Sequence, residues 1–150
     1  MNKNIFVDTN IFVYAYIDND VEKHIIAKKY LQDENNVFMI STQILSEIYA
    51  TLSKYRIEHN KITAIINEIS NLCEVYPVGL QTVKFALDLK NRYFFSYWDC
   101  LFLASALENS CQIVFTEDLQ DGQMIDGRLK TSNPFIAKLL RKDKNGMPLQ

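Results

Sequence analysis

The sequence predicts an α/β fold in which a parallel sheet is covered by helices on both faces. Short apolar runs alternate along the chain with longer segments of helical apolar periodicity. Strands that are linked through helices form βαβ units, and these units build parallel sheets. Glycine and proline are scarce, with 4 and 3 residues in a chain of 150, which favours long regular elements. We expect one domain over residues 1–150, with a core at about 3–136 and a short basic C-terminal tail.

The tetrapeptide Asn-Ile-Phe-Val occurs twice near the start of the chain, at 4–7 and again at 10–13. We interpret the first copy as a buried strand and the second as the start of a helix. Periodicity cannot distinguish a strand from a helix over so few residues. The assignment depends on Asp8-Thr9-Asn10 between the copies, because these residue types favour turns and helix N-caps.

Helices and strands then alternate to the end of the chain. Strands are expected at 37–40, 74–76 and 113–115, with a weak last strand near 128–131. Helices are expected at about 21–33, 61–72, 80–92 and 97–109, and another runs from a Ser41-Thr42 cap to about Tyr55. That helix carries an apolar stripe of Ile44, Ile48, Leu52 and Tyr55. The tail after Phe135 is expected to form a short, fraying helix with four basic residues, Lys138, Arg141, Lys142 and Lys144.

Composition and motifs exclude several classes of protein. The net charge of −2 is unlike that of a strongly basic nucleic-acid binder. Three cysteines without a CxxC pair indicate reduced thiols, so we expect a cytoplasmic protein. No apolar run approaches the length of a membrane span, and we expect no membrane partner. The sequence contains no GxxxxGK[ST], GxGxxG or GxSxG motif.

Four carboxylates, far apart in the sequence, map to one end of the predicted sheet. Asp8 directly follows the first strand, and Asp118 follows the strand at 113–115 after two intervening residues. Glu47 lies in the first two turns of the helix after the second strand, and Asp99 lies in the first turn of a later helix. Because open parallel sheets bind ligands beyond the carboxyl ends of their strands, we expect these four side chains at one site.

Each aspartate also has a purely structural interpretation, since it could cap a helix or a turn. Ser96, three residues before Asp99, forms a variant of a capping box. Glu47 and Asp99, however, have no Lys or Arg three or four residues away that could neutralise them. Carboxylates that gather without a cation repel one another, and a divalent cation reverses that repulsion. An all-oxygen site of this kind suits Mg²⁺ or Mn²⁺.

The order of these acids resembles that in the PIN-domain ribonucleases, in particular toxins of the VapC type, over about residues 3–136. The motifs are Val7-Asp8-Thr9-Asn10, Ser46-Glu47-Ile48, Trp98-Asp99-Cys100-Leu101 and Thr116-Glu117-Asp118-Leu119. The resemblance implies a three-layer α/β/α sandwich with a central, mostly parallel five-stranded sheet. It implies endonucleolytic cleavage of RNA with one or two Mg²⁺ or Mn²⁺ ions. It also implies a homodimer and, for toxin members, a small antitoxin that inserts residues into the acidic groove.

On this hypothesis Asp8, Asp99 and Asp118 hold the metal, and Glu47 is a further ligand or orients the attacking water. All four are therefore the expected catalytic residues.

Four further residues have supporting roles in the same hypothesis. Asn10 and Thr116 are candidates to fix the carboxylate rotamers, because an amide and a hydroxyl can hydrogen-bond to them. Glu117 and Asp121 flank Asp118 and could share or replace its role.

RNA contacts outside the acidic site are less specific in the sequence. Arg92, Lys130 and the basic tail could grip the RNA backbone, although such residues also occur on any solvated surface. Five aromatic residues could stack bases, but core packing or a dimer interface is favoured for most of them. They are Tyr93, Phe94, Phe95, Tyr97 and Trp98.

Two other functions stay open at this point. One is a phosphatase-like hydrolase on a similar sheet, which would act on phosphomonoesters but not on RNA. The other is a catalytically idle PIN-like module that binds RNA or a partner protein, and such a module would fail to bind Mn²⁺.

Overall fold

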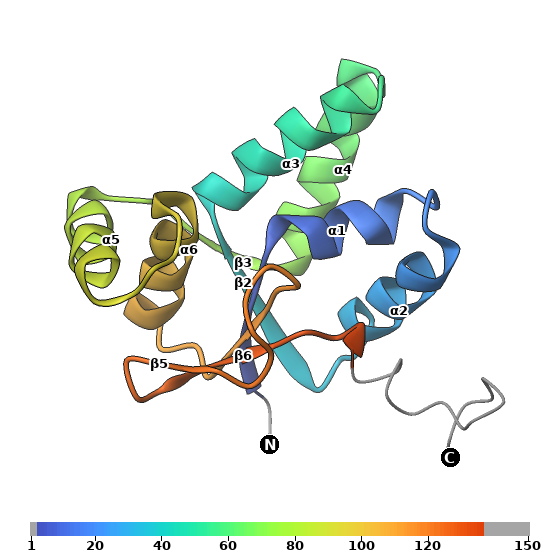
Figure 1. The fold of residues 1–150 in the computed structure, drawn as a ribbon. Coiled ribbons are helices and arrows are strands. Elements are labelled where there is room, and N and C mark those ends of the chain that lie inside the picture. Colours follow the sequence, from blue (N-terminus) through green and yellow to red (C-terminus); the bar gives the residue numbers. More distant parts are fainter. Residues whose placement is uncertain (1–2, 137–150) are drawn as a thin grey trace, which may run out of the picture.

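A six-stranded sheet forms the centre of the computed structural model, which describes residues 3–136 (Figure 1). The strands are β1 (Lys3–Val7), β2 (Asn36–Ser41), β3 (Glu74–Tyr76), β4 (Ile113–Phe115), β5 (Met124–Ile125) and β6 (Leu129–Ser132). Their spatial order is β3-β2-β1-β4-β6-β5. The helix expected in the C-terminal tail, with Lys138, Arg141, Lys142 and Lys144, lies outside the described residues.

Five of the six strands are parallel, and the order of connections reverses at β1. The chain moves outward from β1 to β2 and β3, and then crosses back to β4 on the other side of β1. Phe6 of β1 pairs with Met39 of β2 and with Val114 of β4. The carboxyl ends of β1 and β4 therefore flank a topological switch point, the place where open α/β sheets bind ligands.

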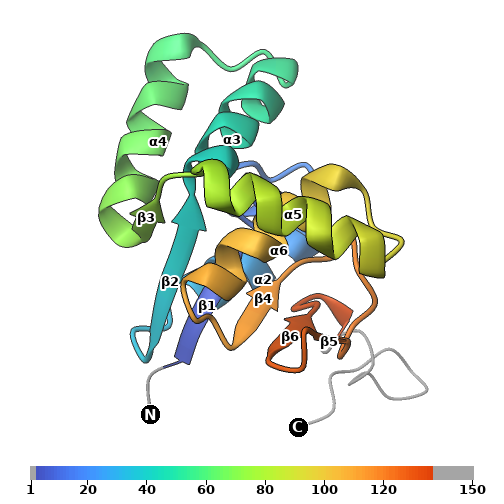
Figure 2. The same ribbon diagram turned by 90° about the vertical axis from the view of Figure 1, so that its left-hand side faces the viewer.

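Helices cover both faces of the sheet, as the sequence predicts. They are α1 (Thr9–Tyr16), α2 (Val21–Leu31), α3 (Thr42–Lys54), α4 (His59–Leu72), α5 (Leu80–Arg92) and α6 (Tyr97–Glu108). In Figures 1 and 2, α1 and α2 lie on one face, and α5 and α6 lie on the other. The α3–α4 pair projects beyond the carboxyl ends of β1 and β2. This arrangement is the expected three-layer α/β/α sandwich.

Helix α6 is the most deeply buried helix, with an unbroken buried run from Cys100 to Leu107. Such an all-round apolar helix requires contacts on every side. It lies between the sheet and α5, and its Phe102 ring stacks on Phe6 of β1 with the ring centroids 6.3 Å apart. The first turn of α6, which carries Asp99, is thereby fixed relative to β1.

Strand β5 is an addition to the five expected strands, and it runs antiparallel to β6. It has two residues, too few to show any periodicity in the sequence. The turn that follows contains Asp126 and Gly127, both with positive φ (53° and 68°), a backbone conformation that Asp tolerates and Gly favours. The strand after this turn ends at Ser132, one residue beyond its predicted end.

The start and the end of α3 differ from the sequence prediction. Ser41 occupies the N-cap position, but its hydroxyl makes no capping hydrogen bond. The Thr42 hydroxyl instead accepts a hydrogen bond from the backbone N–H of Val78 (3.1 Å). Tyr55 follows the last helical residue and is 49% exposed, so its place in the apolar stripe was predicted wrongly. Ile44, Ile48 and Leu52 are fully buried, as predicted.

Two remaining expectations concern cysteines and membranes. Cys73, Cys100 and Cys111 are all free thiols, and the last two are buried. None of the helices formed by residues 3–136 combines the length and the apolar character that a membrane crossing requires.

Candidate active site

The four predicted carboxylates line one cavity at the switch point of the sheet. Asp8, Glu47, Asp99 and Asp118 come from the end of β1, from α3, from α6 and from the segment after β4. The cavity has a volume of about 270 Å³. The topology of the sheet thus brings together acids that are separated by up to 110 positions in the sequence (118 − 8).

Asp8 is the most buried of the four, with 6% of its surface exposed. Its backbone N–H donates to the Phe115 carbonyl (2.9 Å), which extends the β1–β4 pairing by one residue. Its Oδ1 accepts a hydrogen bond from the Thr9 backbone N–H (2.7 Å), and its Oδ2 accepts one from the Thr116 hydroxyl (2.9 Å). Asp8 is therefore the N-cap of α1 and a cavity wall at the same time.

Burial raises the pKa of Asp8 to about 7. The hydrogen bonds from Thr116 and Thr9 act against that rise, whereas the charges of Asp118 and Glu47 add to it. Near neutral pH the ionised form of Asp8 is consequently not favoured over the protonated form unless positive charge enters the cavity.

Glu47 is held by neutral hydrogen-bond donors on two sides. Its Oε2 accepts a hydrogen bond from the Thr9 hydroxyl (2.6 Å), and its Oε1 accepts one from the Gln43 side-chain amide (2.9 Å). The same Gln43 amide also donates to the backbone carbonyl of Trp98 (3.2 Å). These contacts connect α3 to both α1 and α6, so the position of Glu47 depends on three helices.

Asp99 faces the cavity from the first turn of α6, and Asp118 faces it from the segment after β4. The Asp99 backbone N–H donates to the Ser96 hydroxyl (3.1 Å), so Ser96 caps α6 as the sequence predicts. Burial raises the pKa of Asp99, and the charges of Asp118 and Glu47 add to the rise. Burial also raises the pKa of Asp118, followed by the charge of Glu117.

None of the four carboxylates forms an ion pair with another side chain of residues 3–136. Lys54, at the end of α3, is the one basic side chain in the cavity lining described by the structure. Four carboxylates against one lysine leave a surplus of negative charge, and this surplus disfavours simultaneous ionisation.

The four supporting residues separate into two pairs. Asn10 lines the cavity, and Thr116 donates its hydroxyl hydrogen bond to Asp8. Glu117 and Asp121 do not line it. Glu117 accepts hydrogen bonds from Lys23 and Tyr14, and Asp121 accepts one from the Asn133 backbone N–H (2.7 Å).

Three residues around Glu47 were not singled out from the sequence as site residues. Thr9 and Gln43 hold Glu47, and Lys54 lines the cavity beside it. Gln43 and Lys54 stand four positions before and seven positions after Glu47 in one helix, which places all three on one face. That spacing is a usable sequence signal, whereas the contact of Thr9 with Glu47 depends on how α1 packs on α3.

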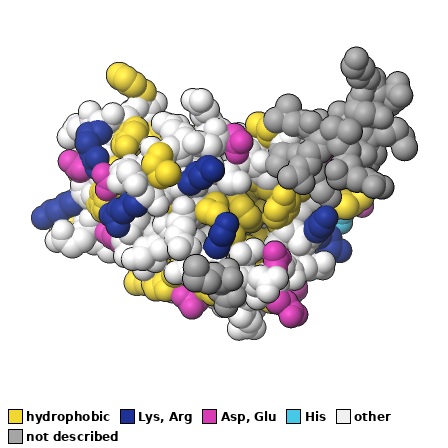
Figure 3. All heavy atoms as spheres, turned by 90° about the horizontal axis from the view of Figure 1, so that it is seen from below, with side chains coloured by type: hydrophobic (Ala, Val, Ile, Leu, Met, Phe, Trp, Pro, Cys, Tyr) yellow, Lys and Arg dark blue, Asp and Glu magenta, His cyan; other side chains and the backbone are white. Residues whose placement is uncertain are grey.

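The basic residues suggested for RNA contact lie away from the cavity. Lys130 pairs with Ile113 at the amino ends of the strands, and Arg92 is engaged with Asp88 and Asp126. Figure 3 shows this amino-end side, where Lys and Arg side chains are scattered among acidic and hydrophobic groups. The structure therefore does not support an RNA contact next to the acids for these two residues.

The carboxylate oxygens are the hard donors that Mg²⁺ and Mn²⁺ prefer. Within residues 3–136, no three His, Cys, Asp or Glu side chains are already arranged to hold a metal ion. The side chains of Asp8 and Glu47 are turned to neutral donors instead. The donor type and the surplus of negative charge fit a divalent cation, with some reorientation of these side chains.

Comparison with known proteins gives one family and several related folds. The family model described as "PIN domain" matches residues 5–120. No curated protein matches the sequence. A solved structure of VapC20 from Mycobacterium tuberculosis, called a sarcin-ricin-loop-cleaving toxin, is 25% identical and has a TM-score of 0.64. That match covers 76% of this chain and 91% of VapC20.

Two further structures are similar in fold at lower identity. One is a toxin–antitoxin complex from Klebsiella pneumoniae (20% identity, TM-score 0.63, 87% of this chain and 97% of that chain). The other is VapBC2 from Rickettsia felis bound to a promoter DNA fragment (15%, TM-score 0.62, 87% and 99%).

Proposed function

The chain belongs to the PIN-domain family, and from that premise we propose that it is a metal-dependent endoribonuclease, the toxin of a toxin–antitoxin pair. The observation that carries the proposal is the cavity lined by Asp8, Glu47, Asp99 and Asp118, which holds four carboxylates without an ion-pair partner among residues 3–136. VapC20, a toxin that is said to cleave the sarcin-ricin loop, supports RNA as the substrate class. Residues 3–136 would form the single catalytic domain.

We assign the metal to Asp8, Asp99 and Asp118, with Glu47 as a further ligand or as the group that orients water. One or two Mg²⁺ or Mn²⁺ ions would be bound, because all the donors are carboxylate oxygens. When bound, such an ion neutralises the carboxylates, polarises a phosphate oxygen and promotes ionisation of water.

The residues of the chain prepare this site in two ways. The Thr116 hydroxyl and the Thr9 backbone N–H hold both oxygens of Asp8, so its carboxylate keeps one orientation. Glu47 Oε2 accepts a hydrogen bond from the Thr9 hydroxyl, and the same oxygen can accept a proton from the attacking water. Lys54 would attract the RNA phosphate to the rim of the cavity.

Metal-dependent cleavage of a single-stranded RNA tests the proposal, with wild type compared with Asp8→Asn. We expect the substitution to lower the cleavage rate by roughly 10³-fold, since it removes a charge that holds the cation. Asp121→Asn is the matched control, because this carboxylate lies outside the cavity. Circular dichroism should show that both variants fold.

Three results would contradict the proposal. Equal cleavage by wild type and Asp8→Asn would exclude the assigned site. Hydrolysis of phosphomonoesters without cleavage of RNA would favour the phosphatase-like alternative. Failure to bind Mn²⁺ together with RNA binding would favour the catalytically idle module.

We further propose that the protein forms a homodimer and is inhibited by a small antitoxin protein that enters the acidic cavity. The likeness in fold to the toxin–antitoxin complexes from Klebsiella pneumoniae and Rickettsia felis supports the antitoxin partner. The homodimer follows from the resemblance to toxins of the VapC type. Light scattering after size-exclusion chromatography measures the assembly, and a mass of one chain at all concentrations would contradict the dimer.

A further inference from the structure

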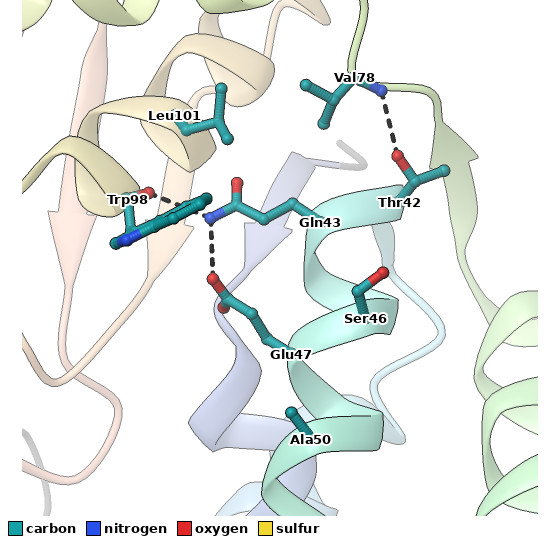
Figure 4. A pocket seen from close by; sticks show the side chains of 8 residues that line it. All are labelled: Thr42, Gln43, Ser46, Glu47, Ala50, Val78, Trp98 and Leu101. Atoms are coloured by element: carbon teal, nitrogen blue, oxygen red, sulfur yellow. Dashed lines mark hydrogen bonds between the residues drawn. The ribbon is translucent and has the colours of Figure 1, made fainter.

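A second cavity lies beside the acidic one, between the first turns of α3 and α6. It has a volume of about 530 Å³. Figure 4 shows its lining side chains, which are Thr42, Gln43, Ser46, Glu47, Ala50, Val78, Trp98 and Leu101. Glu47, Ala50 and Trp98 line both cavities, so a ligand in the acidic cavity can extend into this one.

The chemistry of the second cavity is the opposite of the first. Ala50, Val78 and Leu101 give it apolar walls, and Glu47 on the shared wall is its one charged side chain among the described residues. A phosphate would find no cation among the side chains of this lining. A neutral, flat and partly apolar group fits such walls better.

Trp98 provides a flat surface at the mouth of this cavity. Its side chain is 62% exposed, although it directly precedes Asp99. In Figure 4 the indole lies next to the amide of Gln43. The hydrogen bond from Gln43 to the Trp98 carbonyl fixes the backbone at this point (3.2 Å). An exposed aromatic ring that is anchored through its backbone is a typical surface for stacking a base.

Gln43 contributes a second, independent feature. Both of its side-chain hydrogen bonds within residues 3–136 use the nitrogen, which donates to Glu47 and to Trp98. Its Oε1 is buried and has no hydrogen-bond partner within residues 3–136. A buried carbonyl oxygen without a donor is unfavourable. Nucleobases carry N–H donors on their edges, which can supply the missing hydrogen bond after a small shift of the side chain.

We propose that this second cavity binds the nucleobase adjacent to the scissile phosphate of single-stranded RNA, stacked on Trp98 with its N–H edge toward Gln43. The inference rests on the proposed function, which places the scissile phosphate in the acidic cavity. A base is joined to its phosphate through one ribose, so the two groups occupy neighbouring cavities. Trp98 then determines how the enzyme holds its substrate, while the four acids carry out the hydrolysis.

Fluorescence gives a direct test, because Trp98 is the only tryptophan of the chain. The probe is a hydrolysis-resistant phosphorothioate oligo-uridine added to the wild-type protein with Mg²⁺, and the matched probe is an abasic phosphorothioate strand with the same backbone charge. We expect quenching of the tryptophan emission by the RNA and not by the abasic strand. Equal quenching by both strands, or quenching by neither, overturns the proposal.

Cleavage kinetics provide a second test in the otherwise native protein. We expect Trp98→Ala to raise KM for RNA about tenfold, with kcat changed by less than about threefold, because stacking acts mainly on binding. Trp98→Phe keeps a flat ring and should restore most of the affinity. Phe94→Ala is the control, since Phe94 is fully exposed and lies outside both cavities. An unchanged KM in Trp98→Ala overturns the proposal.

These experiments separate failure of the base site from failure of the proposed function. Base-dependent quenching without any RNA cleavage by the wild type would keep the base site and reject the nuclease. Metal-dependent cleavage without base-dependent quenching, and with a normal KM for Trp98→Ala, would keep the nuclease and reject the base site.

Discussion

Glu117 and Asp118 are neighbours in the chain, but their environments are opposite. Glu117 accepts hydrogen bonds from Lys23 Nζ (2.7 Å) and from the Tyr14 hydroxyl (2.6 Å). Lys23 also lies over the rings of Tyr14 and Phe135, 4.9 and 5.2 Å from their centroids. Asp118 turns to the acidic cavity and has no basic partner in the described part of the chain.

The contrast shows which carboxylate the fold neutralises with its own cation. The hydrogen bond with Glu117 raises the pKa of Lys23, so this ion pair persists across the neutral range. The pKa of Asp118 is raised mainly by burial, which means that its charge is poorly stabilised by the protein alone. The fold neutralises Glu117 with its own Lys23. Under the proposed function, an external cation would neutralise the carboxylates of the cavity.

The largest effect expected from this contrast is on catalysis. Asp118→Asn should lower metal-dependent RNA cleavage by about 10²–10³-fold, because it removes charge from the metal site. Glu117→Gln should lower it by less than about fivefold, since Glu117 lies outside the cavity. Initial rates at saturating Mn²⁺ measure both variants. Similar losses of cleavage in the two variants would contradict the assignment of Asp118, and not Glu117, to the metal site.

The next effect concerns stability without metal. Asp8 has a pKa of about 7 in the folded protein and about 3.8 as its ordinary value. As pH rises, Asp8 loses its proton first in the unfolded chain. The free energy of unfolding therefore falls progressively between about pH 4 and pH 7. Asp8→Asn should therefore stabilise the metal-free protein at pH 8, by up to about 4 kcal/mol.

Urea unfolding in the presence of EDTA measures that change. At pH 4 the two proteins should have nearly equal free energies of unfolding, which provides the internal control. A variant that is less stable than wild type at pH 8 would show that Asp8 acts in the fold mainly as a hydrogen-bonded cap.

Metal binding should produce a smaller stabilisation, in the wild type. Adding Mn²⁺ should raise Tm at pH 8 by several degrees, since a ligand that binds only the folded state stabilises it. The rise should be smaller at pH 5.5, where Asp8 is protonated. Thermal scans with and without EDTA measure it, and Asp8→Asn should lose most of the shift. A pH-independent shift would contradict the role of Asp8 as a ligand.

Breaking the ion pair of Glu117 should have a still smaller effect. Lys23→Met keeps an unbranched side chain but removes the ammonium group that pairs with Glu117 and lies over the Phe135 ring. We expect a loss of about 1–2 kcal/mol in the free energy of unfolding, because a partly buried carboxylate loses a charged hydrogen bond. Denaturant unfolding at neutral pH measures it. A loss of RNA cleavage at unchanged stability would instead place Lys23 in the catalytic site.

The smallest effect is expected for an exposed ion pair at the far end of the sheet. Asp126→Asn removes one of the two ion-pair partners of Arg92, and Asn tolerates the positive φ of this position as well as Asp does. We expect no measurable change of Tm and no change in RNA cleavage. A clear loss of stability would mean that the turn between β5 and β6 depends on this pair.

The sequence was sufficient for features that depend on local pattern. Asp8-Thr9-Asn10 predicted the turn after β1, and Ser96 predicted the cap of α6, because capping uses residues that are close in sequence. The two-residue β5 was missed because it forms only by pairing with β6. The place of Glu47 at the sheet end followed from topology, but its bond with Thr9 depends on the packing of two helices.

The short strands at both margins of the sheet have a consequence for behaviour in solution. One margin is β5 with two residues, and the other is β3 with three. A long unpaired margin would invite strands of other molecules and lead to fibrous aggregates. The short edge strands β3 and β5 offer few unpaired backbone N–H and C=O groups. Copies of the chain should therefore associate through side-chain surfaces rather than by adding strands to the sheet.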